Sequence, residues 1–490
     1  MPKTIFGTTE KSNFILNMKK DTVRRWISGL LLACIIVPLV GSMFITGVDV
    51  ANAANSFLGA FLYATGFSCI LFYIVLLLRK DILFKDCPAA FLIAGLAVLA
   101  FASYYGVVLS TADQERLNTA LLGETGRYEG LLALFAYFGI FLLATAVMKE
   151  SSVKTLFDVL IGAGILQAFV ALLQHIPGNF PSNFRKLPAL VLLKDVHLSS
   201  GLTGSPIFYG SFLTLVSGVA IAGALYDKNI TRARIYGYSA AAFFLTGLFT
   251  SSVVPLIGIG TVLVISVVTM FTTDKGGTKF EGGLLKTSGQ RLAALVAAFA
   301  VIFGLVFAFQ GINLTDQRSE MEKPAMRDKS IAYTDTYFNL FIGGQPSPIN
   351  YDSHWKIGRE RSLDMIKAHP LLGIGPDLMA KTQIGDPEHP ELFTDALDRS
   401  YNEYIYIAAT RGIPSLIVYL ALLGMTFVRL FKGMKEFAAD KEKWFRPALL
   451  AAVIAYSVQA FFSASAVTVA PFFWLLLGMA HSEFPESGKK

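Results

Sequence analysis

The residues best suited to chemistry lie in one short stretch, DRSYNEYIYIAATRG. Asp398, Glu403 and Arg411 are ionisable there, and Tyr401 and Asn402 can form hydrogen bonds through their side chains. The stretch leads without a linker into an apolar run, where each charge is costly to place. Ionisable residues in such positions often mark a substrate pathway, so we expect these side chains to belong to a functional site.

Arginines form a second group, in two other stretches. Arg127 and Glu129 lie in GETGRYEG, and Arg359, Arg361 and His369 lie in IGRERSLDMIKAHP. Arginine can bind phosphate oxygens through two parallel hydrogen bonds, so several arginines with few lysines favour a diphosphate-bearing substrate. Two alternatives stay open: an arginine at a membrane edge can be a snorkelling anchor, and the second stretch can be a solvated helix face.

Carboxylates accompany these arginines and are candidates for a general base. They are Glu403, Asp398, Glu129 and Asp377. A general base must reach the proton that it removes and must titrate near the working pH. Arginines and carboxylates together at the outer face of a membrane would suit a lipid-linked diphosphate substrate.

The composition indicates a polytopic membrane protein. Of the 490 residues, 54% are hydrophobic and only 16% are charged, whereas about a quarter are charged in a soluble domain. The apolar residues occur in runs of about 20, the length that crosses about 30 Å of hydrocarbon. The net charge of +7 comes mainly from short loops beside these runs, which indicates the positive-inside pattern and no nucleic-acid partner.

Neither a metal nor a cofactor is expected. The three cysteines and six histidines show no metal-binding spacing, and no nucleotide-binding motif occurs. The polar start of the chain and the length of the first apolar run argue against a cleavable signal peptide.

We expect an all-α fold with about twelve membrane-spanning helices. The predicted helices are 26–47, 56–78, 88–110, 129–148, 152–174, 205–226, 235–250, 253–271, 292–310, 404–428, 447–463 and 466–480. The predicted domain organisation is a cytoplasmic or interfacial segment at 1–25, nine spans within 26–310, a large extracytoplasmic loop at 311–403, three spans within 404–480 and a cytoplasmic tail at 481–490.

The basic loops predict the orientation. Basic residues collect at 19–25, 79–85, 232–234, 275–291 and 429–446, and twelve spans place all five groups on one side. The positive-inside rule makes that side, and both termini, cytoplasmic. The loop at 311–403 is then outside, and we expect it to fold, with a helical run at 357–369 that Pro370 ends and with turn glycines at Gly373 and Gly375.

Two stretches, IGRERSLDMIKAHPLLGIGPDLM and DRSYNEYIYIAATRGIPSLIVYL, resemble the shared core of the O-antigen ligase and polymerase family. GRYEGLLALFAYFGIFLL and, more weakly, SGLTGSPIFYGSFLTL are similar to further motifs of that family. With the helix layout, the resemblance covers most of the chain. It looks closer to forms from Gram-positive bacteria, which lack lipopolysaccharide, than to the ligases that build it. It implies a GT-C-like polytopic protein of the bacterial cytoplasmic membrane, with its active site facing outside.

The resemblance implies a metal-independent, inverting glycosyltransferase of the cell envelope. Such an enzyme moves a glycan from an undecaprenyl-diphosphate donor to a glycan or cell-wall acceptor hydroxyl, in polysaccharide biosynthesis. By position, Arg127 and Arg361 would hold the diphosphate, with Arg359 assisting. Fixed guanidinium groups stabilise the negative charge that the leaving group gains as the glycosidic bond breaks.

The sequence departs from the family at two positions. Tyr401 stands where ligases of the family carry the histidine thought to activate the acceptor, and Val253 stands where many carry an arginine. Tyrosine is a weak base at neutral pH, so the base would be Glu403 or Asp398, with Tyr401 orienting a sugar.

Three further side chains complete the predicted site, with Asn402, Arg411 and His369 contacting the substrate or acceptor. Arg411 could also reach back along its helix toward Glu403 and hold that carboxylate ionised.

Other functions remain open for the sequence. Ligation and polymerisation use the same chemistry and the sequence does not separate them. A transporter or flippase would place polar residues at mid-membrane, whereas the charges here lie at one face. A catalytically inactive scaffold in an envelope-assembly complex is the third alternative, because of Tyr401.

Overall fold

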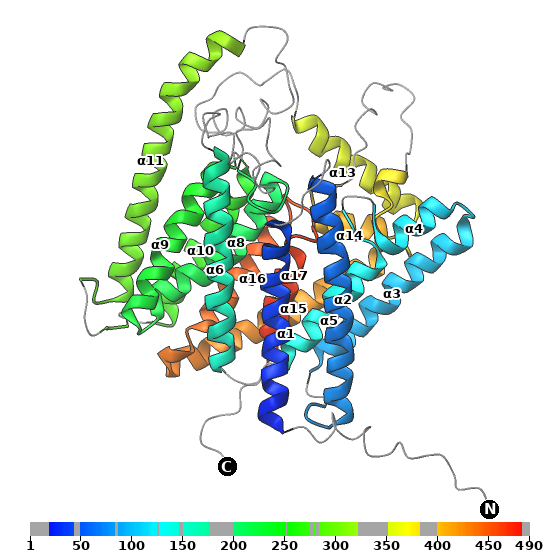
Figure 1. Ribbon diagram of the computed structural model, residues 1–490, viewed down its shortest axis with the longest axis horizontal. Coiled ribbons are helices and arrows are strands. Elements are labelled where there is room, and N and C mark those ends of the chain that lie inside the picture. The colour runs from blue at the N-terminus through cyan, green and yellow to red at the C-terminus, as the bar shows by residue number, and fades with distance from the viewer. Residues whose placement is uncertain are drawn as a thin grey trace, which may run out of the picture.

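The structure is a computed structural model of the chain (Figure 1). It describes residues 19–43, 50–83, 87–124, 127–146, 150–175, 199–250, 252–274, 278–280, 284–321, 351–382 and 399–482. These residues are almost entirely helical and include no strand; their one isolated β-bridge pairs Lys279 with Thr287. The all-α expectation is confirmed for this part of the chain.

The helices of the described residues follow in this order along the chain. They are α1 (Lys20–Met43), α2 (Val50–Leu78), α3 (Ala89–Ser110), α4 (Gln114–Leu122), α5 (Leu131–Thr145), α6 (Glu150–His175), α8 (Pro206–Tyr226), α9 (Ile230–Leu248), α10 (Val253–Thr272), α11 (Ser288–Met321), α13 (Tyr351–Ala368), α14 (Glu403–Arg411), α15 (Ile413–Ala439), α16 (Phe445–Gln459) and α17 (Ala470–Met479).

Seven helices of the described chain are long and apolar enough to cross a membrane. They are α2, α3, α6, α8, α10, α11 and α15. The polytopic membrane character is confirmed, and the count of twelve spans stays a prediction. With 10 residues, α17 is roughly 15 Å long and cannot cross about 30 Å of hydrocarbon on its own.

The predicted single helix at 404–428 is wrong, because the chain breaks there into α14 and α15. Gly412 separates the two helices with φ +84° and ψ 162°, a conformation open almost only to glycine. Pro414 lies in the first turn of α15, where its missing N–H costs nothing.

Two connections also differ from the prediction. The sequence predicts a loop at 111–128, and α4 lies within it. The predicted helices 447–463 and 466–480 are shortened to α16 and α17, and the non-helical residues between them are largely buried. Non-helical backbone is tolerated at membrane depth where protein covers it.

The core of the bundle is built around α8, of which 94% of the apolar window is buried. This helix packs against α9, α10 and α16 (Figure 1). Gly218 of α8 allows a close approach, since a Cβ atom there would lie 2.6 Å from the backbone of Ala452 in α16. Small residues of this kind let membrane helices pack at short range.

The outer surface of the bundle is apolar. Exposed large side chains include Leu71 of α2, Phe101 of α3, Val268 of α10, Leu305 of α11 and Phe431 of α15. A contiguous apolar exterior on a soluble protein would be a liability, whereas lipid covers it in a membrane.

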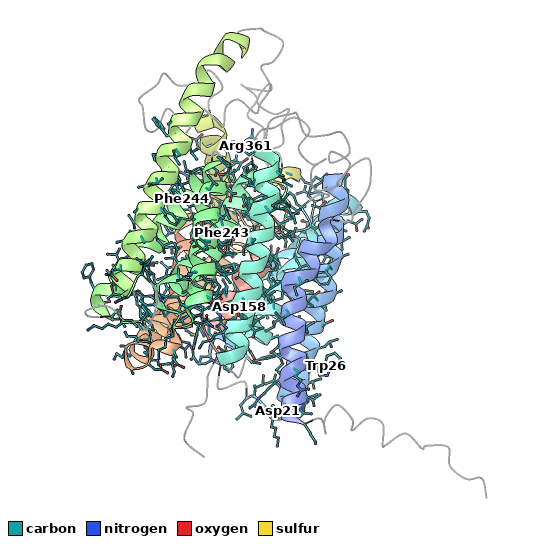
Figure 2. The ribbon with its side chains drawn as sticks, turned by 60° about the vertical axis from the view of Figure 1, so that its left-hand side comes forward. Asp21, Trp26, Asp158, Phe243, Phe244 and Arg361 are labelled. Carbon is teal, nitrogen blue, oxygen red and sulfur yellow. The ribbon has the colours of Figure 1, made fainter. Side chains whose placement is uncertain are left out.

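Ion pairs join several connections at one end of the bundle. At one end, Lys228 pairs with Glu442 at 3.0 Å, and Lys441 pairs with Asp274 at 3.4 Å. These bonds join three of the connections that the basic residues predict to be on one side. Figure 2 shows Asp21, at the start of α1, at the opposite end of the molecule from Arg361 of α13. Which end faces the cytoplasm stays a prediction.

Candidate functional site

The end of α13 is hydrogen-bonded to the break between α14 and α15. The Ile374 N–H donates to the Ala409 carbonyl at 2.9 Å, and the Ile413 N–H donates to the Pro370 carbonyl at 2.8 Å. The first bond holds the segment after α13 against α14, and the second holds it against the start of α15. The two stretches that carry the strongest family resemblance therefore form one structural unit.

Gly373 and Gly375 shape this joint. Their φ angles are +68° and +111°, in a region that side-chain-bearing residues rarely adopt. The Gly375 N–H donates to the carbonyl of Thr410 at 3.0 Å, and a Cβ atom on Gly373 would collide with the Thr410 backbone. Their predicted role as turn residues is confirmed.

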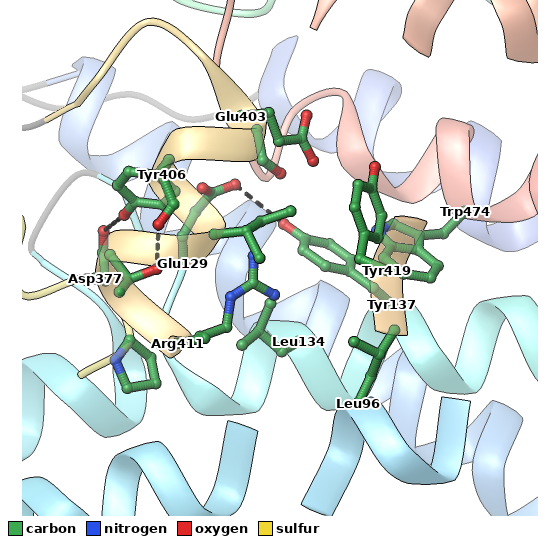
Figure 3. A pocket seen from close by; sticks show the side chains of 14 residues that line it. Leu96, Glu129, Leu134, Tyr137, Asp377, Glu403, Tyr406, Arg411, Tyr419 and Trp474 are labelled. Carbon is green, nitrogen blue, oxygen red and sulfur yellow. Dashed lines mark hydrogen bonds between the residues drawn. The ribbon is translucent and has the colours of Figure 1, made fainter. Parts of the chain in front are cut away.

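Arg127 lies in a buried network with Asp377 and Tyr406. Its Nη2 atom is 2.6 Å from Oδ1 of Asp377 and donates to the hydroxyl of Tyr406 at 2.8 Å. The Tyr406 hydroxyl donates in turn to Asp377 Oδ1 at 3.0 Å (Figure 3), and the Glu124 N–H donates to the other carboxylate oxygen. Arg127 is only 8% exposed, so the arginine predicted to hold a diphosphate contacts a protein carboxylate here.

A small pocket lies beside this network. Side chains from α3, α5, α14, α15 and α17 line it, together with the loops before α5, α14 and α17: Leu96, Glu129, Leu134, Tyr137, Pro376, Asp377, Glu403, Tyr406, Ile407, Thr410, Arg411, Tyr419, Ser465 and Trp474. The cavity of about 20 Å³ has room for about one water molecule. Figure 3 shows Glu129, Glu403 and Arg411 around this space, with the Tyr137 hydroxyl donating to Glu129.

Glu403 is the first residue of α14, and its environment changes its acidity. Burial raises the pKa of its carboxyl group to about 7, and the nearby Glu129 acts in the same direction, against the opposing effects of Arg411 and Tyr419. Loss of hydration outweighs the attraction of the guanidinium. Arg411 still favours the ionised form of Glu403, in the expected direction, and the two side chains form no ion pair among the described contacts.

Arg359 and Arg361 flank the buried face of α13. Ser362 and Met365 form that face, and Ser362 is fully buried. Two residues along a helix are separated by about 200° around its axis, so the two arginines lie on opposite flanks. Arg359 donates from Nη2 to the carbonyl of Phe461, between α16 and α17, at 3.3 Å.

The remaining predicted site residues have different positions. Asn402 caps α14, because its side-chain oxygen accepts from the Ile405 N–H at 3.1 Å. Tyr401 precedes it with φ +48°, and His369 is exposed just after α13, outside the pocket lining. Asp398 lies outside the described residues.

One buried arginine is absent from the predicted site residues. Arg399 is 7% exposed, and its guanidinium lies 4.3 Å from the centre of the Phe208 ring. It is close enough to Glu129 to oppose the effect of burial on that carboxyl group. Its partner Phe208 lies in the stretch SGLTGSPIFYGSFLTL, which resembles a family motif. Nothing in the sequence connects that stretch with position 399.

The joint between α13 and α14 lies within a segment that matches a known family. Residues 238–420 match a family model described as O-antigen ligase. Residues 238–420 are called the O-antigen ligase domain below, after this match. The family resemblance inferred from the sequence is thereby confirmed for this segment, which runs from α9 into α15. No curated protein matches the chain.

The O-antigen ligase domain supports an enzyme function in glycan assembly at a membrane. It includes Arg359, Arg361, Asp377 and Glu403, whereas Arg127 lies outside the matched segment. The bond between Arg127 and Asp377 therefore joins the N-terminal helices to the O-antigen ligase domain.

Proposed function

We propose that the chain is a membrane glycosyltransferase that transfers or polymerises a glycan from an undecaprenyl-diphosphate donor. The observation that carries the proposal is Glu403, a buried carboxylate at the start of α14 with a pKa of about 7. The arginines of α13 lie with it in the O-antigen ligase domain, and Arg127 lies just outside that domain. A general base works best when its pKa is close to the operating pH.

In the proposed reaction, Glu403 and the arginines of α13 have separate roles. The acceptor hydroxyl attacks the anomeric carbon of the donor sugar, the bond from that carbon to the diphosphate oxygen breaks, and the configuration inverts. The hydroxyl proton passes to the carboxylate of Glu403. The leaving diphosphate gains negative charge, which Arg361, with Arg359, stabilises from α13. No metal is needed for this charge balance.

Arg127 enters the proposal through its partner. A phosphate group offers the same pair of oxygen acceptors as the carboxylate of Asp377, so the diphosphate would replace Asp377 on the guanidinium. Tyr401 and Asn402 precede Glu403 directly, and we propose that they, with Asp398, Arg411 and His369, border the path of the acceptor sugar. The active site would face outside the cytoplasmic membrane.

The proposal is tested with purified protein in lipid nanodiscs. An undecaprenyl-diphosphate-linked repeat unit from the host is added, and the lipid products are followed by mass spectrometry for wild type, Glu403→Gln and Arg361→Gln. Longer lipid-linked glycans would show polymerisation, and glycan on an added acceptor would show ligation. Glu442→Gln and Lys367→Gln, both at exposed positions away from the pocket, are the matched controls.

We expect both controls to retain full product formation and both site variants to lose most of it. Unchanged substrate with the wild type, across several acceptors, would contradict the transferase function and favour the inactive scaffold. Full activity of Glu403→Gln would remove Glu403 as the base while leaving the transferase function intact.

A further inference from the structure

A second cavity lies at the other end of the bundle, between α9 and α11. It has a volume of about 330 Å³, within the usual range for ligand sites. Its lining is mostly apolar and includes two arginines, Arg234 of α9 and Arg291 of α11. This groove contains none of the residues assigned to glycan transfer, so a ligand bound there would be independent of the proposed transferase function.

Arg291 is placed to bind an anion in this groove. Its side chain is 6% exposed, and its Nη1 atom donates to the carbonyls of Ala224 and Asp227 at 3.2 and 3.0 Å. The guanidinium lies 3.5 Å from the centre of the Phe280 ring, which holds its plane. The Nη2 atom has no hydrogen-bond partner among the described residues, and an unsatisfied buried donor of this kind is costly.

Small residues form the walls of the groove. Ala233, Gly237 and Ala241 recur every four residues along α9, and Ala294 and Ala298 face them from α11. From Ile230 to Ala241 the groove extends for roughly 16 Å along α9, the reach of an extended acyl chain. Because these side chains are small, they leave the groove open to lipid and do not fill it.

The surroundings of the groove identify the type of ligand. Tyr238 and Leu284 border it and are 75% and 95% exposed, so apolar surface at its edge is left uncovered by protein. The groove lies at the same end of the bundle as the ion pairs of Lys228 with Glu442 and of Lys441 with Asp274. The anionic headgroups of the cytoplasmic leaflet are expected at that end. A ligand with a phosphate group and an apolar tail suits both the two arginines and the apolar residues of the lining.

We propose that this groove binds one anionic phospholipid, with its phosphate at Arg291 and Arg234 and an acyl chain along the small residues of α9 and α11. Arg291 would place the phosphate through Nη2, and Arg234, which makes no side-chain bond with described residues, would supply the second cation. The bound lipid would fill the space that the two helices leave between them.

Native mass spectrometry of the full chain in detergent tests the proposal. Dissociation constants are measured for phosphatidylglycerol with wild type, Arg291→Gln, Arg234→Gln and Ala298→Leu. Arg25→Gln is the matched control, because Arg25 is an exposed arginine of α1 outside the groove. We expect each groove variant to weaken binding about tenfold and the control to match wild type.

Three comparisons identify the ligand. Phosphatidylcholine should bind at least tenfold more weakly than phosphatidylglycerol, and inorganic phosphate at millimolar concentration should not displace the lipid. Arg234→Gln keeps the measurement valid if Arg291→Gln fails to fold, since Arg234 supports no other described element. Equal binding to Arg234→Gln and Arg25→Gln would overturn the site. Displacement by inorganic phosphate, or tighter binding of undecaprenyl phosphate than of phosphatidylglycerol, would overturn the phospholipid assignment.

Discussion

Arg127 and Asp377 are joined at 2.6 Å in the interior of the protein, although 250 positions separate them in the chain. Arg127 precedes α5 and Asp377 follows α13, so this one bond ties the first helices to the joint beside α14. Its surroundings are nearly dry, because the side chain of Asp377 is fully buried. The pair therefore serves the packing of the site as well as any contact with substrate.

Asp377→Asn should be strongly destabilising. The substitution removes the carboxylate charge that lies 2.6 Å from the buried guanidinium of Arg127, and breaking such a pair costs on the order of 3–5 kcal/mol. Thermal unfolding in detergent, followed by tryptophan fluorescence, measures the loss. Asp364→Asn removes an exposed i,i+3 pair with Lys367 and should change stability by less than about 0.5 kcal/mol. Equal effects of the two variants would show that the buried pair is not a structural tie.

The stability contribution of Glu403 should depend on pH. Its folded-state pKa of about 7 lies above the usual value of 4.5, so folding favours the protonated carboxyl group. The contribution is fully present below about pH 4.5 and is lost as the pH rises through 7. Glu403→Gln, which stays neutral, should therefore raise the melting temperature at pH 8 and change it little at pH 5.

Activity should have the opposite dependence on the same group. A base must be ionised, so product formation should increase as the pH rises through about 7. Initial rates between roughly pH 5.5 and pH 8.5 measure this increase in product formation. A rate that is flat across that range would argue against Glu403 as the base, and Asp398 would become the next residue to replace.

Gly412→Ala should destabilise the protein by about 1–3 kcal/mol. The backbone at this position has φ +84° and ψ 162°, which is strained for any residue with a side chain. An added Cβ atom would also collide with the backbone of Leu371. Gly424→Ala is the matched control, since Gly424 lies within α15 with nothing within 4 Å of the added atom. That change should be neutral or stabilising by up to about 1 kcal/mol. Thermal unfolding of the two variants, side by side, checks the difference.

Arg361→Lys should lose about 10²-fold in product formation, close to Arg361→Ala. Lysine keeps the charge and lacks the planar pair of donors that matches two phosphate oxygens. Arg359 lies on the opposite flank of α13 and donates to the Phe461 carbonyl, so Arg359→Lys should have a smaller effect. Rates for both lysine variants and for Lys367→Gln separate the contributions. Recovery of full activity by Arg361→Lys would show that charge alone suffices at this position.

Local patterns explain what could be predicted from the sequence. The apolar runs mark the long helices because a membrane imposes their length, and Gly373 and Gly375 are recognisable as turn residues from their spacing after Pro370. The predicted helix 404–428 does not include the break at Gly412, although Gly-Ile-Pro at 412–414 is a helix-stop signal followed by a helix-start signal. An apolar run conceals such a break, because hydropathy does not change across it.

The partners of the charged residues could not be predicted in the same way. Asp377 is a general-base candidate by sequence and is held by Arg127 in the structure, and Arg399 lies over Phe208 from another part of the chain. These contacts cross more than 100 positions and depend on how the helices pack. The pKa of Glu403 likewise depends on packing, because burial raises it by more than the charge of Arg411 lowers it.

The backbone bonds from Ile374 and Ile413 have a thermodynamic consequence. They connect the segment after α13, the helix that carries Arg361, to the last turn of α14, which begins with Glu403, and to the start of α15. Two sites on such a rigid unit share one equilibrium, and their coupling free energy is reciprocal. If a donor diphosphate tightens the binding of an acceptor by some factor, the acceptor must tighten the binding of the donor by the same factor.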